Sequence, residues 1–271
     1  MKYFDSHAHY YDERFESECS EGADNLIGAL LKEKVSGIIN VGTSPETSLL
    51  AIEQAKRHEN MFTAIGIHPS DSQYLKEPIE SALSKIEQLI KAPESKCVCL
   101  GEIGLDYHYP DTDKACQMLY FEEQMRLAEY LSIPVSIHDR EAHMDVLEVI
   151  KRHPNVKGVL HSYSGSLEMA NELVMRGYMI SFSGTLTFTN ARRPKEVAAA
   201  LPKESILIET DCPYLAPHPH RGKLNHSGYL EYTNKILSEL LCITEDEAAE
   251  LTENNARRFF KLDEKSNVHN L

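Results

Sequence analysis

Short apolar runs alternate along the chain with segments whose apolar residues recur every three or four positions. The runs have the length of buried strands, and the segments between them have the spacing of amphipathic helices. The pattern predicts eight strands: the run that leads into Asp5, and residues 35–41, 62–67, 97–103, 134–137, 156–160, 178–182 and 205–208. It predicts helices at residues 22–34, 45–58, 78–91, 114–131, 141–153, 166–176, 194–201, 227–241 and 245–261.

Regular alternation of strands and helices indicates a parallel sheet. Eight such units in roughly 250 residues are typical of a (β/α)8 TIM barrel. A doubly wound open sheet is the alternative, but no GxGxxG segment follows a strand and opens a helix. The linkers have ordinary lengths, so we expect residues 1–271 to form a single domain.

Histidines and carboxylates follow the predicted strands at the point where each strand ends. Side chains alternate faces along a strand, so His7 and His9 are expected to point the same way. Five of the 13 histidines lie at strand ends, and the others are scattered over expected helices and loops. The strand-end set consists of His7, His9, His68, Glu102, His138, His161 and Asp211. We expect all of them at the C-terminal face of the barrel, where the active sites of this fold lie.

Four of these histidines and the two carboxylates form a ligand set that is too large for one tetrahedral ion. Divided between two divalent ions, they predict a binuclear metal centre that Glu102 bridges, because its strand lies between the two ligand groups. Two ions about 3.5–4 Å apart deprotonate a bound water and stabilise charge on a substrate oxygen. We therefore expect hydrolysis of an ester, amide or phosphoester, with Asp211 able to accept the proton of the water.

The charge balance restricts the class of partner. The formal net charge is −14, which argues against a protein that wraps duplex nucleic acid with a broad basic surface. A small cationic cleft on an acidic body remains compatible with this charge. No stretch approaches about 20 consecutive apolar residues, so no transmembrane helix is expected, and no signal peptide is visible. The six cysteines form no CxxC pair, which favours reduced thiols and a cytoplasmic location.

Longer stretches around these residues resemble the TatD family of metal-dependent deoxyribonucleases, within the amidohydrolase-like barrels. The similarity runs in order from Asp5 to about Phe260. The matching stretches are residues 5–9 (DSHAH), 66–69 (GIHP), 101–107 (GEIGLDY), 134–140 (PVSIHDR), 161–165 (HSYSG), 208–215 (IETDCPYL), 221–225 (RGKLN), 253–255 (ENN) and 258–260 (RFF).

The resemblance implies a ligand set, a substrate and a cofactor. The implied ligands are His7, His9, Glu102 and Asp211 for one ion, and Glu102, His138 and His161 for the other. Family members are described as hydrolysing DNA phosphodiesters, several as 3′–5′ exonucleases on single strands, so the implied substrate is DNA with single-stranded ends. The implied cofactors are two divalent ions, which can be magnesium, manganese or zinc. Family members are mostly cytoplasmic, and we expect a monomer.

Four further residues are expected to contact a phosphate. Arg221 and Lys223 follow the last predicted strand, and an arginine can grip a phosphate with two hydrogen bonds. His68 and Arg140 follow strands on the same face. Asp106 is expected to position a histidine or a water. The chain departs from the family pattern after Asn225. The family commonly has a proline soon after this asparagine, whereas here His226 and Ser227 follow it, which implies a differently shaped loop after the eighth strand.

Two other functions remain open on the sequence. The same ligands suit a binuclear hydrolase that acts on a small-molecule ester, amide or phosphoester. Many binuclear relatives bridge their ions with a carbamylated lysine after the fourth strand, whereas Glu102 stands there in this chain, which favours the TatD-like reading. A catalytically inactive barrel that binds a partner is the other alternative, although all six proposed ligands are present.

Overall fold

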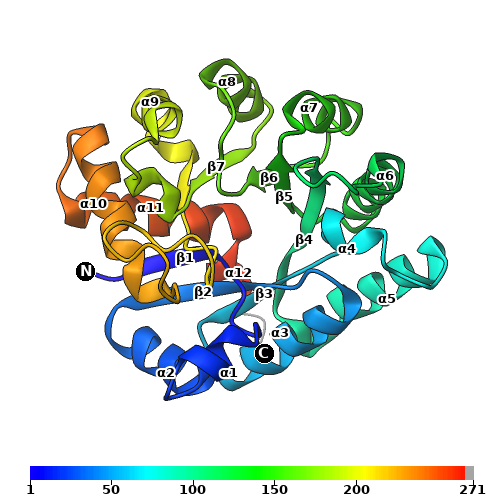
Figure 1. Ribbon diagram of the computed structural model, residues 1–271, viewed down its shortest axis with the longest axis horizontal. Helices are drawn as coiled ribbons and strands as arrows, with labels where there is room; N and C mark the ends of the chain where they lie inside the picture. Colours follow the sequence, from blue (N-terminus) through cyan, green and yellow to red (C-terminus); the bar gives the residue numbers. More distant parts are fainter. Residues whose placement is uncertain (266–271) are drawn as a thin grey trace.

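The computed structural model describes residues 1–265 and contains an eight-stranded parallel sheet. The strands lie in the order of the sequence, and each pairs in parallel with the next. Their bounds are β1 Tyr3–Ala8, β2 Val35–Val41, β3 Met61–Ile65, β4 Cys97–Asp106, β5 Val135–Arg140, β6 Gly158–Leu160, β7 Met179–Phe182 and β8 Ile206–Ile208. Figure 1 shows the strands in the middle of the molecule and the helices around them.

Helices follow the strands throughout this part of the chain. The α-helices are α1 Arg14–Glu18, α2 Ala23–Glu33, α3 Pro45–Arg57, α4 Pro69–Ser72, α5 Ile79–Lys91, α6 Lys114–Leu131, α7 His143–Arg152, α8 Leu167–Met175, α9 Arg192–Ala200, α10 Leu230–Leu241, α11 Glu245–Phe260 and α12 Leu262–Lys265. Single 3-10 turns are η1 Pro93–Ser95, η2 Gly184–Thr187, η3 Lys203–Ser205 and η4 Ser227–Tyr229. The predicted (β/α)8 barrel is confirmed.

The barrel closes between β1 and the segment that follows β8. Ala8 and Cys212 form a parallel bridge, and the backbone N–H of His9 donates to the carbonyl of Cys212 over 2.7 Å. The N–H of Asp211 donates to the carbonyl of His7 over 2.9 Å. The first and last strands therefore bring the HxH segment next to Asp211.

Two strands extend further than the hydrophobic pattern predicts. β4 continues to Asp106, so Glu102 lies within the strand and does not close it. β5 continues to Arg140, so His138 also lies within its strand and does not follow it. The β4 extension is buried and includes Asp106, whereas the β5 extension is polar and partly exposed, and a pattern of apolar residues reports neither.

The interior of the barrel is filled by apolar side chains at the end opposite to the polar strand ends. Strands β1–β4 and β6–β8 contribute to one buried cluster. Ala256 and Phe260 of α11 and Leu262 of α12 belong to the same cluster. The C-terminal helices therefore cover this end of the barrel, and the opposite end remains available for a site.

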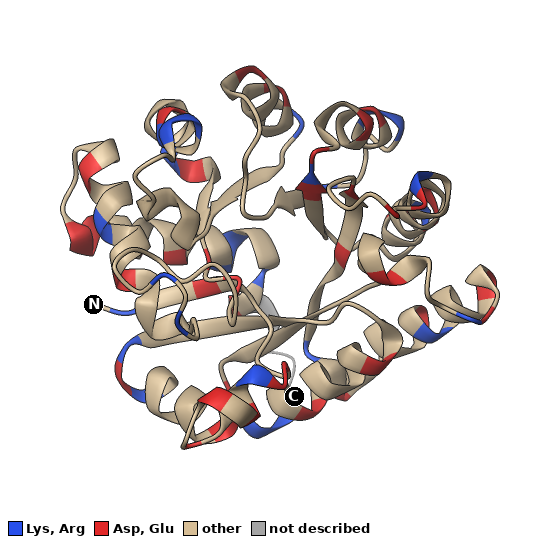
Figure 2. Cartoon of the chain, in the orientation of Figure 1, with Lys and Arg blue, Asp and Glu red and all other residues tan. Residues whose placement is uncertain are grey.

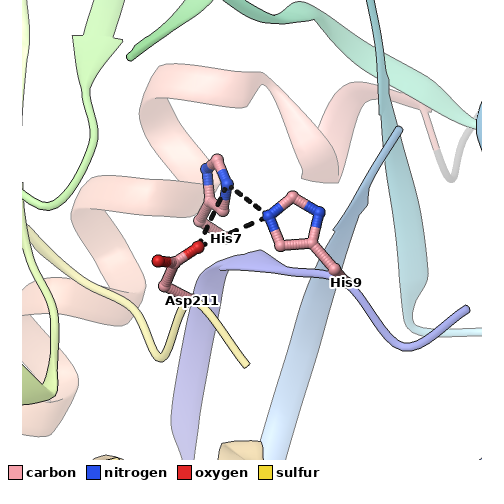
Figure 3. Close-up of side chains that lie close together, drawn as sticks. All are labelled: His7, His9 and Asp211. Atoms are coloured by element: carbon pink, nitrogen blue, oxygen red, sulfur yellow. Dashed lines mark hydrogen bonds and ion pairs between the residues drawn. The ribbon is translucent and has the colours of Figure 1, made fainter. Parts of the chain in front are cut away.

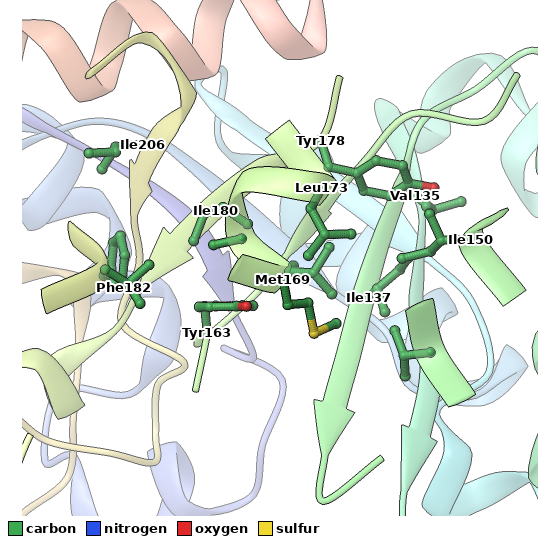
Figure 4. Packing of buried hydrophobic residues seen from close by; sticks show 14 of the residues in the cluster. Val135, Ile137, Ile150, Tyr163, Met169, Leu173, Tyr178, Ile180, Phe182 and Ile206 are labelled. Carbon is green, nitrogen blue, oxygen red and sulfur yellow. The ribbon is translucent and has the colours of Figure 1, made fainter. Parts of the chain in front are cut away.

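A second cluster joins β4–β8 to the helices outside them. Figure 4 shows part of it, with Leu173 of α8 and Ile150 of α7 close to side chains of β5 and β7. Burying each such side chain contributes about 1.5–3 kcal/mol. This packing holds the strands that carry the site residues in a fixed register.

Local sequence signals explain where α3 begins and why β4 and β5 lie so close. Ser44 accepts a hydrogen bond from the N–H of Thr47, Thr47 bonds back, and Pro45 is the first helical residue, as the sequence predicts. Gly104 has a φ of 130°, and a Cβ at this position would lie 2.1 Å from the carbonyl oxygen of His138. Only glycine therefore allows the end of β4 to lie against β5.

The outer helices carry acidic and basic residues interspersed (Figure 2). Among residues 1–265, no helix combines the length and the apolar composition that crossing a bilayer requires.

Candidate metal centre

The six predicted metal ligands lie together at the carboxyl ends of the strands. His7 lies in β1 and His9 follows it, Glu102 lies in β4, His138 lies in β5, His161 follows β6, and Asp211 comes after β8. All six contribute to two adjacent groups of side-chain nitrogen and oxygen atoms. The centre is therefore built by strands far apart in the sequence.

The first group combines the HxH segment with Asp211. Nε2 of His7 lies 3.1 Å from Nε2 of His9, and the two nitrogens lie 3.8 Å and 3.4 Å from Oδ1 of Asp211. Oε2 of Glu102 lies 3.3 Å and 3.6 Å from the same two nitrogens. Figure 3 shows His7, His9 and Asp211 converging from β1 and from the segment after β8. We call this group the His7/His9 position.

The second group uses the other oxygen of Glu102. Oε1 lies 2.7 Å from Nε2 of His161 and 2.8 Å from Nδ1 of His138. These two nitrogens lie 3.1 Å apart. We call this group the His138/His161 position. Each oxygen of the Glu102 carboxylate thus faces a different group of histidines.

The separations at the His7/His9 position suit coordination of a divalent ion, whereas those at the His138/His161 position, from 2.7 Å to 3.1 Å, are hydrogen-bond distances. With bonds of about 2.0–2.1 Å, the ligand atoms of a tetrahedral site lie about 3.3–3.4 Å apart. At the His7/His9 position the measured separations range from 3.1 Å to 3.8 Å. Because buried carboxylates and imidazoles need charge compensation, these clusters can hold metal.

His9 and His161 each use the ring nitrogen that points away from Glu102 in a hydrogen bond, which leaves the other nitrogen for a metal. Nδ1 of His9 lies 2.7 Å from the carbonyl oxygen of Val41, so Nδ1 carries a proton and Nε2 is the nitrogen left to bind a metal. Nδ1 of His161 lies 3.2 Å from Oε1 of Glu209, with the same consequence. In each ring the nitrogen that faces Glu102 is therefore the one that can bind a metal once any proton on it has been displaced.

His68 has the opposite arrangement. It caps α4, and its Nδ1 accepts a hydrogen bond of 3.1 Å from the N–H of Ser70. Burial lowers the pKa of His68 to about 3, so the ring is neutral and its one proton lies on Nε2. Nε2 lies 3.5 Å from Oε1 of Glu102. Although His68, Glu102 and His138 are close enough to suggest another ligand group, His68 presents a donor and not a lone pair.

The charges in the centre stabilise one another. Burial acts to raise the pKa of the Glu102 carboxyl, but the charge of His161 and the hydrogen bond with His138 act against burial, and that pKa lies well below its usual range. Burial acts to lower the pKa of His161, but Glu102 and Glu209 outweigh it and raise that pKa well above its usual range. Protons and divalent ions therefore compete for the same lone pairs.

Sequence reasoning did not assign a role to Asp5, although this residue begins the DSHAH stretch. Its carboxylate accepts hydrogen bonds from the N–H and the hydroxyl of Thr210 and from the hydroxyl of Ser227. Asn225 donates to the carbonyl of Thr210 over 2.8 Å. Asp5 and Asn225 therefore fix the segment that carries Asp211. Glu209, which contacts His161, was also missed; the acidic residue two positions before Asp211 is the signal that was available.

Five of the six proposed ligands, all but His7, line a cleft of about 1170 Å3. Arg140 and His68 both line this cleft. Nη1 of Arg140 lies 3.4 Å from the hydroxyl of Tyr109 and 4.0 Å from Oδ2 of Asp106. Among the described residues that line the cleft, Arg140 is the one lysine or arginine.

The structure separates the other two predicted phosphate contacts. Arg221 is exposed, and its guanidinium lies 4.3 Å from the ring centroid of Phe188, which lines the cleft. Lys223 is exposed in the same turn but does not line the cleft. The structure thus places Arg221 beside the cleft wall and does not bring Lys223 to it.

Comparison with known proteins agrees with this geometry. Residues 4–261 match the family model described as "TatD related DNase". The chain is 37% identical to a metal-dependent hydrolase of Bacillus subtilis, YabD, over 96% of this chain and 99% of the relative. It is 33% identical to a metal-dependent hydrolase of Mycobacterium tuberculosis, TatD, over 84% and 87% of the two chains. The crystal structure of YJJV, a TatD homologue of Escherichia coli, superposes with a TM-score of 0.86 at 30% identity, covering 96% of this chain and 98% of that one.

Proposed function

The chain is a metal-dependent hydrolase that belongs to the family of TatD-related DNases, and we propose that it cleaves DNA phosphodiester bonds as a 3′–5′ exonuclease at single-stranded ends. The observation that carries this proposal is the carboxylate of Glu102, whose two oxygens face two different groups of ring nitrogens. A bridging carboxylate of this kind supports a centre with two divalent ions. Bound at these positions, the ions supply an activated water and neutralise charge on phosphate oxygens.

Asp211 is the residue to which we assign proton acceptance. Burial acts to raise its pKa, but the hydrogen bond with His9 and the charge of His161 outweigh burial and lower that pKa. The carboxylate is therefore ionised at neutral pH, and it lines the cleft. An ionised carboxylate beside the attacking water can act as general base.

His68 and Arg140 are suited to hold the phosphate. Nε2 of His68 carries a proton and points toward the centre, so it can donate to a phosphate oxygen. Arg140 has a side chain that is 44% exposed, and its guanidinium has a fork geometry that matches phosphate. His68 follows β3 and Arg140 ends β5, and both line the cleft beside the candidate metal centre.

The charge of the cleft supports a strand end as the substrate. Besides the proposed ligands, the lining residues include Asp12, Asp71, Asp106 and Asp139, against the single arginine. A surface of this kind makes few phosphate contacts, which suits an enzyme that takes in one end of a strand. We also propose that the chain acts as a single-domain monomer in the cytoplasm.

The acidic lining also keeps a second function in view. A substrate with little negative charge, such as a small-molecule ester or amide, would be less repelled by these aspartates than DNA is. The same metal ligands and the same proton acceptor would serve its hydrolysis.

The experiment that tests the proposed function is a cleavage assay on end-labelled single-stranded DNA with added Mg2+ or Mn2+. The control is Asp211→Asn, purified in parallel. Asparagine tolerates the left-handed backbone that Asp211 adopts, with a φ of 57°, so this variant is expected to fold. A p-nitrophenyl phosphodiester and an amide substrate are tested beside the DNA.

Stepwise shortening from the 3′ end that requires the metal and disappears in Asp211→Asn would support the proposal. Hydrolysis of the small substrates without DNA cleavage would favour the second function. Equal DNA cleavage by both proteins would contradict the role that we assign to Asp211.

A further inference from the structure

A buried carboxylate lies behind His161, on the side away from Glu102. The side chain of Glu209 is completely buried, and its Oε1 lies 3.2 Å from Nδ1 of His161. The same oxygen accepts a hydrogen bond of 2.8 Å from the N–H of Ser162. His161 is therefore held between two carboxylates, one on each ring nitrogen.

The contacts with Ser162 and His161 use only one oxygen of Glu209. Its second oxygen, Oε2, is buried and has no hydrogen-bond partner among residues 1–265. Burying a carboxylate that keeps one oxygen unsatisfied destabilises a protein. A contact that orients and polarises His161 accounts for a carboxylate at this place.

His138 also has a carboxylate behind it, at ion-pair distance and without a hydrogen bond to its Nε2. Oδ2 of Asp106 lies 3.4 Å from Nε2 of His138, the nitrogen opposite to the one that faces Glu102. Asp106 is also buried, and its other oxygen accepts a hydrogen bond from the N–H of His108. Both histidines of the His138/His161 position thus have a carboxylate behind them.

The histidines of the His7/His9 position have neutral partners. Nδ1 of His9 lies 2.7 Å from the carbonyl oxygen of Val41. Nδ1 of His7 lies 3.4 Å from the hydroxyl of Ser136. The two positions therefore differ in the charge that lies behind their imidazoles.

We propose that Glu209 is a positioning residue for His161, and that Glu209 and Asp106 together make metal affinity at the His138/His161 position depend on buried negative charge. This inference rests on the proposed metal centre. A carboxylate behind a ligating histidine fixes the ring and makes its other nitrogen a stronger donor, and its loss typically lowers metal affinity about 10–100-fold. The His7/His9 position has no such dependence.

The test is a titration of the metal-free protein with Zn2+ and with Mn2+, by calorimetry or by competition with a chelator. The variants are Glu209→Gln and Asp106→Asn, which remove the charge and keep the shape. Ser136→Ala is the matched control, because it removes the neutral partner of His7. His138→Ala identifies which binding step belongs to the His138/His161 position.

We expect two binding steps in the wild type, and a weakening of about 10–100-fold in one of them for Glu209→Gln. Asp106→Asn is expected to weaken the same step, and it serves alone if Glu209→Gln does not fold. Ser136→Ala is expected to change either step less than about threefold. Thermal unfolding of the metal-free proteins shows whether the variants remain folded.

The inference would be overturned if the folded Glu209→Gln and Asp106→Asn proteins left both metal-binding steps unchanged, or weakened both equally. The proposed function would then still stand. A wild-type protein that binds no divalent ion would overturn the metal centre itself. The readout is metal binding, so it does not depend on knowing the substrate.

Discussion

Nε2 of His68 lies 3.5 Å from Oε1 of Glu102, and it carries the proton of the ring because Nδ1 accepts the N–H of Ser70. The four other histidines of the centre turn a nitrogen toward Glu102 or its partners as possible metal ligands. His68 thus differs from its neighbours in tautomer and not in location. Its role is expected to concern the substrate.

This difference predicts how His68 variants behave. His68→Ala is expected to lower kcat/KM on DNA about 10–100-fold, which corresponds to about 1.4–2.7 kcal/mol of transition-state binding. Metal stoichiometry should stay unchanged, and His68→Gln should recover part of the activity because its amide still donates. Steady-state kinetics combined with elemental analysis checks both points. Loss of one bound ion in His68→Ala would show that His68 is a ligand.

Glu102 is expected to be indispensable for both metal positions. Glu102→Gln replaces one oxygen by an amide nitrogen that cannot ligate, so we expect at most one tightly bound ion. We also expect kcat/KM to fall more than about 100-fold, which exceeds the effect of losing a residue that only contacts a ligand. Elemental analysis and kinetics measure the two effects. Glu53→Gln, on the exposed face of α3, is the control that should change neither. Two ions bound with unchanged affinity in Glu102→Gln would exclude the bridging role.

The single arginine of the cleft predicts a weak salt dependence of DNA binding. DNA binding is measured with the Asp211→Asn protein, and the logarithm of the binding constant is plotted against the logarithm of the salt concentration. The slope should be shallower than about −5. Arg140→Met should reduce its magnitude by about 0.7, the value for one phosphate of a single strand. Lys223→Met should leave the slope unchanged, because Lys223 does not line the cleft. A slope that Lys223→Met changes and Arg140→Met does not would reverse the assignment of the two residues.

His226 predicts a pH-dependent stability outside the metal centre. Burial lowers the pKa of His226 from 6.5 to about 4, and its Nδ1 accepts a hydrogen bond from the N–H of Gly228. The unfolded chain binds this proton more readily, so the contribution of His226 is complete above pH 6.5 and is lost as the pH falls toward 4. Partial exposure screens the effect, which we expect to be on the order of 2 kcal/mol.

Denaturant unfolding of the metal-free protein at several pH values measures this contribution. His226→Asn keeps an acceptor and removes the titration, so it should lose less stability than the wild type between pH 6.5 and 4. His218→Gln changes an exposed histidine and is the control. Identical pH profiles for wild type and His226→Asn would show that His226 has no such role.

Much of the fold could be predicted because its elements are long and periodic. α6 and β2 have the predicted bounds, and Ser44 and Pro45 mark the start of α3. The single-turn helices α1 and α4 could not be predicted, because five or four residues show no period. α4 depends on a cap from His68, a residue whose sequence pattern indicated chemistry instead.

Of the candidate site, the sequence predicts the residues near strand ends but not the residues that contact them. The ligand residues could be predicted because they lie near the carboxyl ends of strands, whereas the roles of Asp5 and Glu209 depend on partners 205 and 48 residues away in the sequence. The tautomer of His68 likewise depends on the backbone of α4. Such relationships are set by tertiary structure, and no local pattern reports them.

The most direct test of the metal centre is anomalous diffraction from crystals grown with Mn2+. Two peaks are predicted: one among His7, His9 and Asp211, and one between His138 and His161, with one oxygen of Glu102 on each. A single peak away from Glu102, or a peak held by Nε2 of His68, would contradict the account of a centre bridged by Glu102.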